Sequence, residues 1–587
     1  MKFSDQMAIW LRESGYSTCF FVAGGNSMHL LNSFRGVFNC VPVVHEVTGV
    51  IAAEYFNQHS LADRAFVLVT AGPGLTNAVT GIAGAWLESR PVLVIGGQVK
   101  TSDLASRSLR QRGIQEIGGS EIVRSITKVS TTLQRPVDKT TFLNLINETD
   151  GGRSGPVFVE VCLDVQGAPA VETSMVWSTS QPQTNLDTRA EQIVRLEGMI
   201  RDSKRPVLLL GGGVPRSWAR EHLEQLDSLG TPIQVTWNGA DRYAGDRPLW
   251  FGRPDTWGMR FANIILQQAD LVIVVGARLG LQQTGFNWQS FVPSGKVIHV
   301  CNDEAELNKG HPRTDEKLCC DAADFLTWLI SLSVPAPKEW LASCRQIQEA
   351  VPLSDPQNSS HPGFHNPYEF VLQLSALCDS TDRIVPCSSG GANTVMMQAF
   401  LNKTGQIFFN DRALASMGYG LAGAIGAAMA LPSRRTILVE GDGGFAQNLQ
   451  DLGTVAINAL NLKMFIFENE GYASIRMTQR NYFDGAYVGC DRTTGLGFPD
   501  WQLLASAYGI ASLELSANFQ QSSQFVDLFN SRGPVLFRVP IHPEQTYYPK
   551  ITSRVSASGS MESAPLHLMS PDLPEETARE VFQFLPV

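Results

Sequence analysis

The chain has 587 residues, of which 43% are hydrophobic and 17% are charged, as in an ordinary globular protein with large buried cores. Its formal net charge of −10 argues against sequence-independent nucleic-acid binding, because such binding needs a basic surface. No apolar run reaches the length of a membrane span, and the N-terminus shows no signal-peptide cleavage pattern. The ten cysteines contain no Cys-x-x-Cys pair, so we expect reduced thiols in a cytoplasmic protein that has no membrane association.

The first distinctive segment is an apolar strand that ends at a charged residue. Val41–Glu46 is predicted to be a short strand that ends in a charged residue, and a helix is predicted to follow over Val47–Gln58. Taken alone, Glu46 is typical of a helix N-terminus, where the helix dipole favours a negative charge. A ligand contact is the alternative, and it depends on what the rest of the chain can bind.

A parallel βαβ unit is predicted next. The strand Ala65–Val69 leads into the turn Thr70–Asn77 and a helix that extends to about Leu87, and a second strand follows at Pro91–Ile95. The two glycines in the turn suit a tight strand-to-helix connection, whether or not it contacts a ligand. The strand Val157–Val161 completes this first α/β block.

A second α/β block is predicted after the polar stretch Ser178–Leu186, whose Ser, Thr, Gln and Pro content is typical of a linker. Its first strand, Val207–Leu210, runs into three glycines, which indicates a Rossmann-type turn, but the G-x-G-x-x-G spacing is not matched. Further buried strands are predicted at Leu271–Val275 and Lys296–Val300, and Pro335–Pro362 is again linker-like.

A glycine-rich segment opens the informative part of the third block. Met417 lies in Ala415–Gly420, ahead of a helix of small residues that is predicted over Leu421–Ala430. A methionine in such a position is usually part of a core, although its adaptable thioether also suits an irregular ligand pocket.

The segment Val439–Ile475 predicts a strand, an acidic glycine turn, a helix and a returning strand. The turn is Gly441–Gly444, and Asn469 and Gly471 follow the second strand. Asp442 and Asn469 lie 27 positions apart (469 − 442). Both are therefore expected at the carboxyl ends of adjacent parallel strands, where open α/β sheets bind ligands.

This turn offers the groups that a magnesium ion and a diphosphate require. Carboxylate, amide and carbonyl oxygens are suitable Mg²⁺ ligands, and glycine lets the backbone approach a phosphate closely. A helix is predicted to start near Gln447 or Asn448, with its positive N-terminal end towards the anion. The alternative is an ordinary strand-to-helix turn, in which Gly and Asp serve turn geometry alone.

These segments together resemble the thiamine diphosphate-dependent enzymes, and within them the acetolactate synthase-like group. The family's G-D-G and N-N cofactor motif is matched at Gly441–Gly443 and Asn469, with Glu468 in place of the first Asn. The family's T-S-G-P-G-x-T-N pattern is matched at Thr70–Asn77, with Ala71 in place of Ser. The resemblance covers most of the chain.

The resemblance implies roles for several of these residues. In the family, a glutamate at the position of Glu46 hydrogen-bonds the aminopyrimidine ring and favours the imino tautomer, which takes the proton from the thiazolium carbon. Met417 would wedge under the cofactor and bend it, and Gln115 would contact the substrate. Ser388–Asn393 occupies the second diphosphate-contacting loop but lacks the histidine of many members.

The predicted site therefore contains three groups of residues. The catalytic candidates are Glu46, Gln115 and Met417. The metal ligands are Asp442, Asn469 and Gly471. The cofactor-binding residues are Glu46, Pro73, Asn77, Gly390, Asn393, Ala415, Met417, Gly441, Asp442, Gly443, Gly444, Asn469, Gly471, Tyr472 and Ala473.

Two arginines are left with alternatives. Arg476 is either a contact for an acceptor carboxylate or phosphate, or a solvated surface charge, and the second is favoured. Arg278, beside a segment that resembles the flavin-adjacent part of acetolactate synthases, would face the nucleotide part of FAD. The alternative is a central domain that keeps its fold with an empty pocket, so FAD is left open.

The predicted fold class is α/β, with three doubly wound parallel-sheet domains. These are a pyrimidine-binding domain at 1–170, a central Rossmann-like domain at 188–340 and a diphosphate-binding domain at 360–545, followed by a tail at 546–587. The resemblance implies that the cofactor bridges the first domain of one subunit and the third domain of another. We therefore expect a homodimer or homotetramer.

The predicted function is thiamine diphosphate- and magnesium-dependent decarboxylation of a 2-oxo acid such as pyruvate, with carboligation of the two-carbon unit to an aldehyde or ketone. The partners are therefore small molecules. A simple 2-oxo acid decarboxylase or an aldehyde lyase of the same family is one alternative. A flavin or nicotinamide oxidoreductase built on the central glycine turn is the alternative from a different class.

Overall fold

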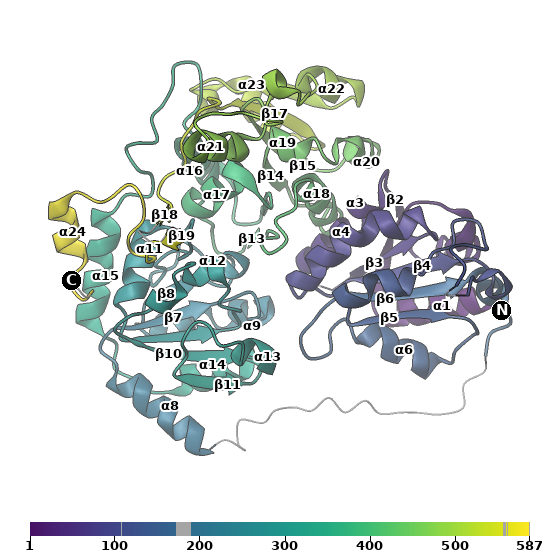
Figure 1. Ribbon diagram of the computed structural model, residues 1–587, viewed down its shortest axis with the longest axis horizontal. Coiled ribbons are helices and arrows are strands. Elements are labelled where there is room, and N and C mark those ends of the chain that lie inside the picture. Colours follow the sequence, from purple (N-terminus) through teal and green to yellow (C-terminus); the bar gives the residue numbers. More distant parts are fainter. Residues whose placement is uncertain (61, 107, 172–189, 556–558, 560, 586–587) are drawn as a thin grey trace. The chain divides into compact units, whose positions relative to one another are not determined.

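The computed structural model describes all residues except 61, 107, 172–189, 556–558, 560, 586 and 587 (Figure 1). Contacts divide the chain into two compact units. The first comprises Met1–Gln181, Asp382–Gly390 and Asp411–Pro540, and the second comprises Pro182–Thr381, Gly391–Asn410 and Ile541–Val587. The linker predicted at Ser178–Leu186 lies outside the described residues.

The first unit begins with a parallel sheet in the order β2-β1-β3-β4-β6-β5. Its strands are β1 (Tyr16–Phe21), β2 (Asn39–Pro42), β3 (Arg64–Val69), β4 (Leu93–Gln98), β5 (Val129–Leu133) and β6 (Val157–Cys162). Its helices are α1 (Phe3–Glu13), α2 (Met28–Phe34), α3 (Glu46–His59), α4 (Pro73–Leu87), α5 (Gly119–Val123), α6 (Lys139–Asn147) and α7 (Leu163–Gly167).

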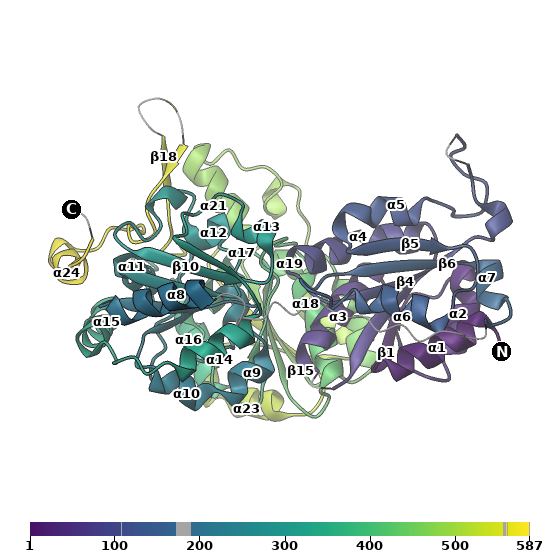
Figure 2. The same cartoon turned by 90° about the horizontal axis from the view of Figure 1, so that it is seen from below.

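Helices cover both faces of this first sheet. Apolar side chains of α1, α2 and α6 pack on one face, among them Phe3 and Phe142. On the other face Gly49 of α3 packs against Val67 of β3. Figure 2 shows α4 and α5 on one side of strands β4–β6 and α6 on the other. The sheet is therefore doubly wound, as predicted.

The C-terminal part of the first unit has a second parallel sheet, in the order β12-β14-β15-β17-β16. Its strands are β12 (Arg383–Pro386), β14 (Thr436–Gly441), β15 (Leu462–Glu468), β16 (Ala511–Glu514) and β17 (Val535–Pro540). Its helices are α18 (Tyr419–Ala430), α19 (Asp442–Phe445), α20 (Leu452–Ile457), α21 (Ala473–Tyr482), α22 (Trp501–Ala507) and α23 (Ser523–Asn530). Gly441 of β14 pairs with Phe467 of β15, which places Asp442 and Asn469 after adjacent parallel strands as predicted.

Helix α3 packs along α18 within the first unit (Figure 1). A Cβ atom on Gly426 would lie 2.0 Å from the carbonyl oxygen of Ala52, and one on Gly423 would lie 2.7 Å from the ring of Tyr55. Larger side chains at these positions of α18 would push the two helices apart. The small residues of α18 therefore allow the helix that begins at Glu46 to approach the second sheet closely.

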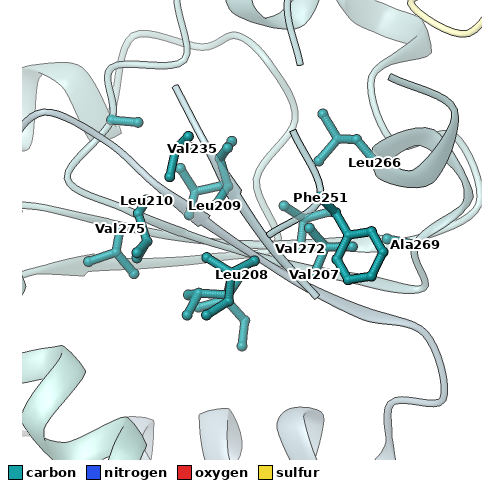
Figure 3. Packing of buried hydrophobic residues seen from close by; sticks show 14 of the residues in the cluster. Val207, Leu208, Leu209, Leu210, Val235, Phe251, Leu266, Ala269, Val272 and Val275 are labelled. Atoms are coloured by element: carbon teal, nitrogen blue, oxygen red, sulfur yellow. The ribbon is translucent and has the colours of Figure 1, made fainter. Parts of the chain in front are cut away.

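The second unit contains a parallel sheet in the order β11-β10-β9-β7-β8. Its strands are β7 (Pro206–Leu210), β8 (Ile233–Val235), β9 (Leu271–Val275), β10 (Lys296–Cys301) and β11 (Glu316–Cys319), and β13 (Ile407–Phe408) also belongs to this unit. Its helices include α8 (Ala190–Asp202), α9 (Arg216–Glu221), α10 (Leu223–Ser228), α11 (Arg260–Gln268), α12 (Leu281–Thr284), α13 (Glu304–Leu307), α14 (Ala322–Ser331), α16 (Pro367–Leu377) and α17 (Gly390–Ala399). Figure 3 shows apolar side chains of β7, β8 and β9 packed with Phe251, Leu266 and Ala269. Strands buried on both faces are typical of parallel sheets.

Two segments of the second unit refine the sequence predictions. Helix α15 (Lys338–Ala350) occupies much of Pro335–Pro362, so the linker prediction is wrong there. Its buried residues Trp340, Cys344 and Ile347 recur at helical spacing, but the flanking prolines hid this pattern. The tail forms β18 (Ser553–Val555), β19 (Met561–Ser563) and α24 (Glu575–Val581), and α24 packs on α15 within the second unit.

Two other observations concern the whole described chain. All ten cysteines are free in this structure. Among the described residues, no helix combines the length and the apolar character needed to cross a lipid bilayer.

Candidate active site

The turn after β14 fixes an acidic side chain by backbone hydrogen bonds. Asp442 is 1% exposed, and its Oδ2 accepts the N–H groups of Asn469 at 3.0 Å and Gly471 at 3.2 Å. Its Oδ1 accepts the N–H of Gly443 at 2.7 Å. Burial raises the pKa of Asp442 to about 7, although these three N–H groups act in the opposite direction. The side chain is thus held in one orientation at the carboxyl end of the strand.

The helix after this turn begins earlier than predicted. Helix α19 starts at Asp442 itself and ends at Phe445, and α20 follows only at Leu452. The start predicted near Gln447 or Asn448 is therefore wrong, because the helical turn opens directly at the strand end. Asn448 instead donates from Nδ2 to the carbonyl oxygen of Gly418 at 2.8 Å, which joins this segment to the start of α18.

Three polar groups meet at the acidic turn. The side-chain amide of Asn469 has one terminal atom 2.9 Å from the carbonyl oxygen of Gly471 and 3.2 Å from Asp442 Oδ1. Neighbouring ligands of an octahedral Mg²⁺ ion lie about 3 Å apart, because each oxygen is about 2.1 Å from the metal. Without a cation, the Asn469 amide donates N–H to both oxygens, and turning the amide over would direct its oxygen to a bound metal.

These residues fit a magnesium ion. One carboxylate, one amide and one carbonyl leave room for phosphate and water oxygens, which Mg²⁺ usually retains. Among the residues that the structure describes, no cluster of three or more His, Cys, Asp or Glu could hold a metal. A metal at this turn would therefore have the single carboxylate of Asp442 and would depend on neutral oxygens and the diphosphate for its other ligands.

The loop from Asn469 to Tyr472 has an unusual backbone. Glu470 has a φ of 63°, and Gly471 has a φ of 138°. A Cβ atom on Gly471 would lie 2.2 Å from the carbonyl oxygen of Cys490, so only glycine fits there. The ring of Tyr472 covers Gly443, and Ala473 begins α21. The loop is thus packed against the turn after β14.

The sequence prediction missed Glu440, a buried carboxyl behind the turn. Its Oε2 accepts the N–H of Leu421 at 3.2 Å, near the start of α18. A Cβ atom on Gly420 would lie 2.4 Å from Oε2, and one on Gly444 would lie 2.8 Å from Oε1. Burial raises the pKa of Glu440 to about 8. The residues of β14 from Thr436 to Glu440 are all buried, so a carboxyl at the end of this otherwise uncharged run is the signal that could have revealed it.

Glu46 lies at the start of α3 beside a second glycine turn. It is 7% exposed, and its Oε2 accepts a hydrogen bond from Asn77 Nδ2 at 3.0 Å. Within the described chain, no hydrogen bond to Glu46 Oε1 is formed, and that oxygen faces Gly74. Pro73 opens α4, and a Cβ atom on Gly72 would lie 2.5 Å from the carbonyl oxygen of Gln115. The structure thus brings together all four predicted residues of the N-terminal part, including Gln115, which has a φ of 63°.

Met417 lies beside the segment that follows the acidic turn. Gln447 Nε2 lies 3.8 Å from Met417 Sδ, and Met417 is 36% exposed, which is unusual for a large apolar residue ahead of a buried helix. Ala415 has a φ of 52°, and its N–H donates to Asp411 Oδ1 at 3.0 Å. Hydrogen bonds at Ala415 and Gly418 therefore fix the backbone on both sides of the exposed Met417 thioether.

Gly390 and Asn393, the two predicted cofactor contacts of the second diphosphate loop, differ in their surroundings. Ser388 donates its hydroxyl to the carbonyl oxygen of Ser416, which places the approach to Gly390 beside Met417. Gly390 belongs to the first unit and has a φ of 78°. Asn393 belongs to the second unit, where its Oδ1 accepts a hydrogen bond from Asn410 Nδ2 at 3.2 Å.

Arg476 is not the solvated surface charge that the sequence analysis favoured. Its residue is 5% exposed, and its guanidinium donates to the carbonyl oxygens of Asn469 at 3.3 Å and Glu470 at 3.1 Å. The prediction failed because the guanidinium turns inward to backbone carbonyls rather than outward to solvent.

The glycines of the central turn are explained by loop packing. A Cβ atom on Gly211 would lie 2.2 Å from the carbonyl oxygen of Gly276, and Gly213 also lies against Gly276. Arg242 donates to the carbonyl oxygens of Gly212 at 3.1 Å and Val214 at 2.5 Å. These glycines are therefore needed by the fold itself and give no separate support for a dinucleotide.

Comparison with protein-family models decides the family. Models of the thiamine pyrophosphate enzyme N-terminal TPP binding domain, central domain and C-terminal TPP binding domain match residues 1–122, 193–329 and 389–539. The chain belongs to the thiamine pyrophosphate enzyme family. The predicted family and the α/β fold with three parallel sheets are thereby confirmed.

Similar proteins narrow the group further. The chain is 28% identical to the acetolactate synthase isozyme 2 large subunit of Escherichia coli, over 94% of this chain and 98% of that protein. It is 31% identical to the isozyme 1 large subunit of the same organism, over 83% of this chain and 84% of that protein. A probable acetolactate synthase large subunit of Methanocaldococcus jannaschii is 30% identical over 85% of each chain. The chain is thus a thiamine pyrophosphate enzyme of the acetolactate synthase-like group.

Proposed function

We propose that this enzyme uses thiamine pyrophosphate and Mg²⁺ to decarboxylate a 2-oxo acid and to join the resulting two-carbon unit to an aldehyde or ketone. The observation that carries the proposal is the meeting of the Asp442 carboxylate, the Asn469 side-chain amide and the Gly471 carbonyl at one point beside the acidic turn. The names of the similar proteins support pyruvate as the first donor to test. A decarboxylase that releases the aldehyde without ligation is the second candidate.

The chain's own residues have distinct roles in this proposal. The bound cofactor supplies the carbon nucleophile and the electron sink that decarboxylation needs. Asp442, Asn469 and Gly471 hold the metal, and the glycines beside Asp442 let the backbone approach a diphosphate. The remaining residues would act on the rings of the cofactor and on the substrate.

Glu46 would accept or hold a proton at its Oε1. Asn77 binds the other carboxyl oxygen and so fixes the direction of the group. Met417 would support the bent cofactor through its exposed thioether, and Gln115, beside Gly72, would contact the substrate.

The proposed enzyme has a pyrimidine-binding domain at 1–170, a central domain at 188–340, a diphosphate-binding domain at 360–545 and a tail at 546–587. Its proposed active form is a homodimer or homotetramer. Cofactor contacts are proposed for the remaining members of the predicted set, including Gly390, Asn393, Ala415 and Tyr472. FAD stays open as a bound cofactor, and it is not part of the proposed mechanism, because decarboxylation and carboligation on the thiamine cofactor need no redox partner. An absorption spectrum of the purified protein near 450 nm tests for flavin directly.

The deciding experiment combines a binding and a product measurement. Thiamine pyrophosphate and Mg²⁺ together should raise the melting temperature of the wild-type protein, because a ligand that binds only the folded state stabilises it. Asp442→Ala should lose this Mg²⁺-dependent shift. The loaded enzyme is then incubated with 2-oxo acids, with and without carbonyl acceptors, and the products are identified by mass.

Each outcome of this experiment has a defined meaning. Ligated products support the proposed function, and an aldehyde formed equally with and without an acceptor supports the decarboxylase. A melting temperature that does not respond to cofactor and metal contradicts both candidates.

A further inference from the structure

The guanidinium of Arg476 contacts the loop that carries two of the three proposed metal ligands. Arg476 Nη1 donates to the carbonyl oxygen of Asn469, and Nη2 donates to that of Glu470. These two residues begin the loop. The side chain reaches back from the first turn of α21, and it is almost fully buried. Its guanidinium therefore binds backbone oxygens rather than solvent.

A separate segment, Cys490–Thr494, lies behind the same loop and is here called the backing segment. Gly471 forms an antiparallel bridge with Asp491, and the N–H of Tyr472 donates to the carbonyl oxygen of Cys490 at 2.8 Å. Asp491 Oδ2 forms an ion pair with Arg476 Nε at 3.4 Å. The loop is therefore held from one side by Arg476 and from the other by the backing segment.

Asp491 is itself fixed in place. Its Oδ1 accepts hydrogen bonds from the Thr494 N–H at 3.0 Å and from the hydroxyls of Thr493 at 2.8 Å and Thr494 at 2.9 Å. Since the carboxylate cannot swing away, it provides a rigid partner for the guanidinium. This rigidity passes through Arg476 to the two carbonyl groups of the loop.

The loop needs such support because its backbone is strained at the point that matters for a metal. The left-handed conformation of Glu470 turns the chain so that the Asn469 side chain and the Gly471 carbonyl point to the same place. A non-glycine residue prefers to leave this conformation unless its surroundings hold it there. Relaxation of Glu470 would separate the two oxygen ligands.

We propose that Arg476, braced by Asp491, is a positioning residue that presets the metal-binding loop before cofactor and metal arrive. This proposal rests on the proposed function, since it assigns the loop to Mg²⁺. It also replaces the role of acceptor contact for Arg476, because the guanidinium is engaged by Asn469, Glu470 and Asp491. The expected effect of losing Arg476 is weaker metal binding by a protein that still folds.

The test compares Arg476→Gln, Arg476→Lys and the control Arg492→Gln in the full-length protein. Arg492 lies in the backing segment next to Asp491, but its side chain is exposed and donates to the carbonyl oxygen of Phe498. The first measurement is the Mg²⁺ concentration that gives half-maximal retention of thiamine pyrophosphate. The second is hydrogen exchange of the amides of residues 469–472 in the cofactor-free protein.

Arg476→Gln should raise the half-saturating Mg²⁺ concentration by about tenfold or more, as substitutions of residues that orient metal ligands typically do. Arg476→Lys should lie between this variant and the wild type, and Arg492→Gln should match the wild type. The amides of residues 469–472 should exchange faster only in the Arg476 variants. An unchanged Mg²⁺ requirement, or faster exchange spread over the whole C-terminal sheet, would overturn the proposal.

Two arrangements keep this test decisive. If Arg476→Gln does not fold, Asp491→Asn removes the brace while the guanidinium stays, and an unchanged Mg²⁺ requirement in that variant overturns the proposal. If the wild-type protein binds no thiamine pyrophosphate with Mg²⁺, the proposed function fails. The exchange measurement then still decides whether Arg476 orders the loop.

Discussion

Thr48 and Asp451, which are 403 positions apart in the chain, are joined by a hydrogen bond of 2.7 Å from Oγ1 to Oδ2. Asp451 is fully buried and also accepts the N–H of Val44 and the hydroxyl of Thr454, each at 2.9 Å. Thr48 and Val44 lie two residues from Glu46 on either side (48 − 46 and 46 − 44). One carboxylate therefore fixes the start of α3 to the segment that follows the acidic turn.

Asp451→Ala should destabilise the protein by about 3 kcal/mol, because it leaves the buried hydroxyls of Thr48 and Thr454 without their acceptor. Each unsatisfied buried donor costs about 1–3 kcal/mol, and water can replace part of the bond to the Val44 N–H, because Val44 is exposed. Thermal unfolding monitored by circular dichroism measures the loss. Thr48→Val removes only one of the three bonds and should cost about 1 kcal/mol. Equal effects of the two substitutions would show that Asp451 does not act through these contacts.

Glu46→Gln should nearly abolish turnover and leave cofactor retention largely intact. The amide keeps the size of the side chain and can still bond Asn77, but it cannot exchange a proton as the carboxyl can. Turnover and bound thiamine pyrophosphate are measured on the same preparation. A variant that keeps most of its activity would remove Glu46 from the proposed mechanism.

Mixing Glu46→Gln subunits with Asp442→Ala subunits tests where the site is formed. If Glu46 of one subunit serves Asp442 of another, a mixed dimer contains one site with both wild-type residues, and activity should return to a substantial fraction of the wild type. The contact between Thr48 and Asp451 is formed within one chain. Activity that stays at the level of the separate variants would therefore assign both residues of a site to a single chain.

Asp241→Asn should destabilise the second unit, and the effect should depend on pH. Burial raises the pKa of Asp241, but Arg216 and Arg242 outweigh this effect and lower it to about 2. The unfolded carboxyl titrates near a pKa of about 3.9. The stability that Asp241 contributes is therefore complete above about pH 4 and is lost as the pH falls through 2.

Near neutral pH the substitution should cost about 3–5 kcal/mol, because it leaves buried guanidinium groups without their counter-charge. Denaturant unfolding of the wild type and the variant at pH 7, 4 and 2.5 gives the difference. This difference should shrink between pH 4 and 2.5. A constant difference over this range would mean that the charge of Asp241 contributes little.

The sequence predicts the parts of the site that follow from strand order. The spacing between Asp442 and Asn469 fits one βαβ crossover, and parallel strands bring such ends to the same edge of a sheet. The glycine turn before Asn77 is found by the same reasoning, because it follows a strand, and the helix predicted from Val47 begins at Glu46, shortly after β2 ends at Pro42.

Contacts that cross between loops could not be predicted in this way. Periodicity assigns faces of elements, but on α21 it is Ile475 that is 48% exposed, while Arg476 is buried. The carbonyl groups that bind Arg476 belong to a left-handed turn at Glu470, which a non-glycine residue rarely forms. The pairing of Thr48 with Asp451 depends on how α3 meets α18, and local sequence carries no signal for it.

The carboxyl of Glu440 occupies space that exists only because positions 420 and 444 carry no side chain. The residues that positions 420 and 444 accept therefore depend on the residue at position 440. A methyl group added at Gly420 or Gly444 would collide with the carboxyl, and the same methyl group becomes permissible once position 440 is shortened to alanine. Directed evolution of this enzyme would therefore have to change the strand before it could change either glycine.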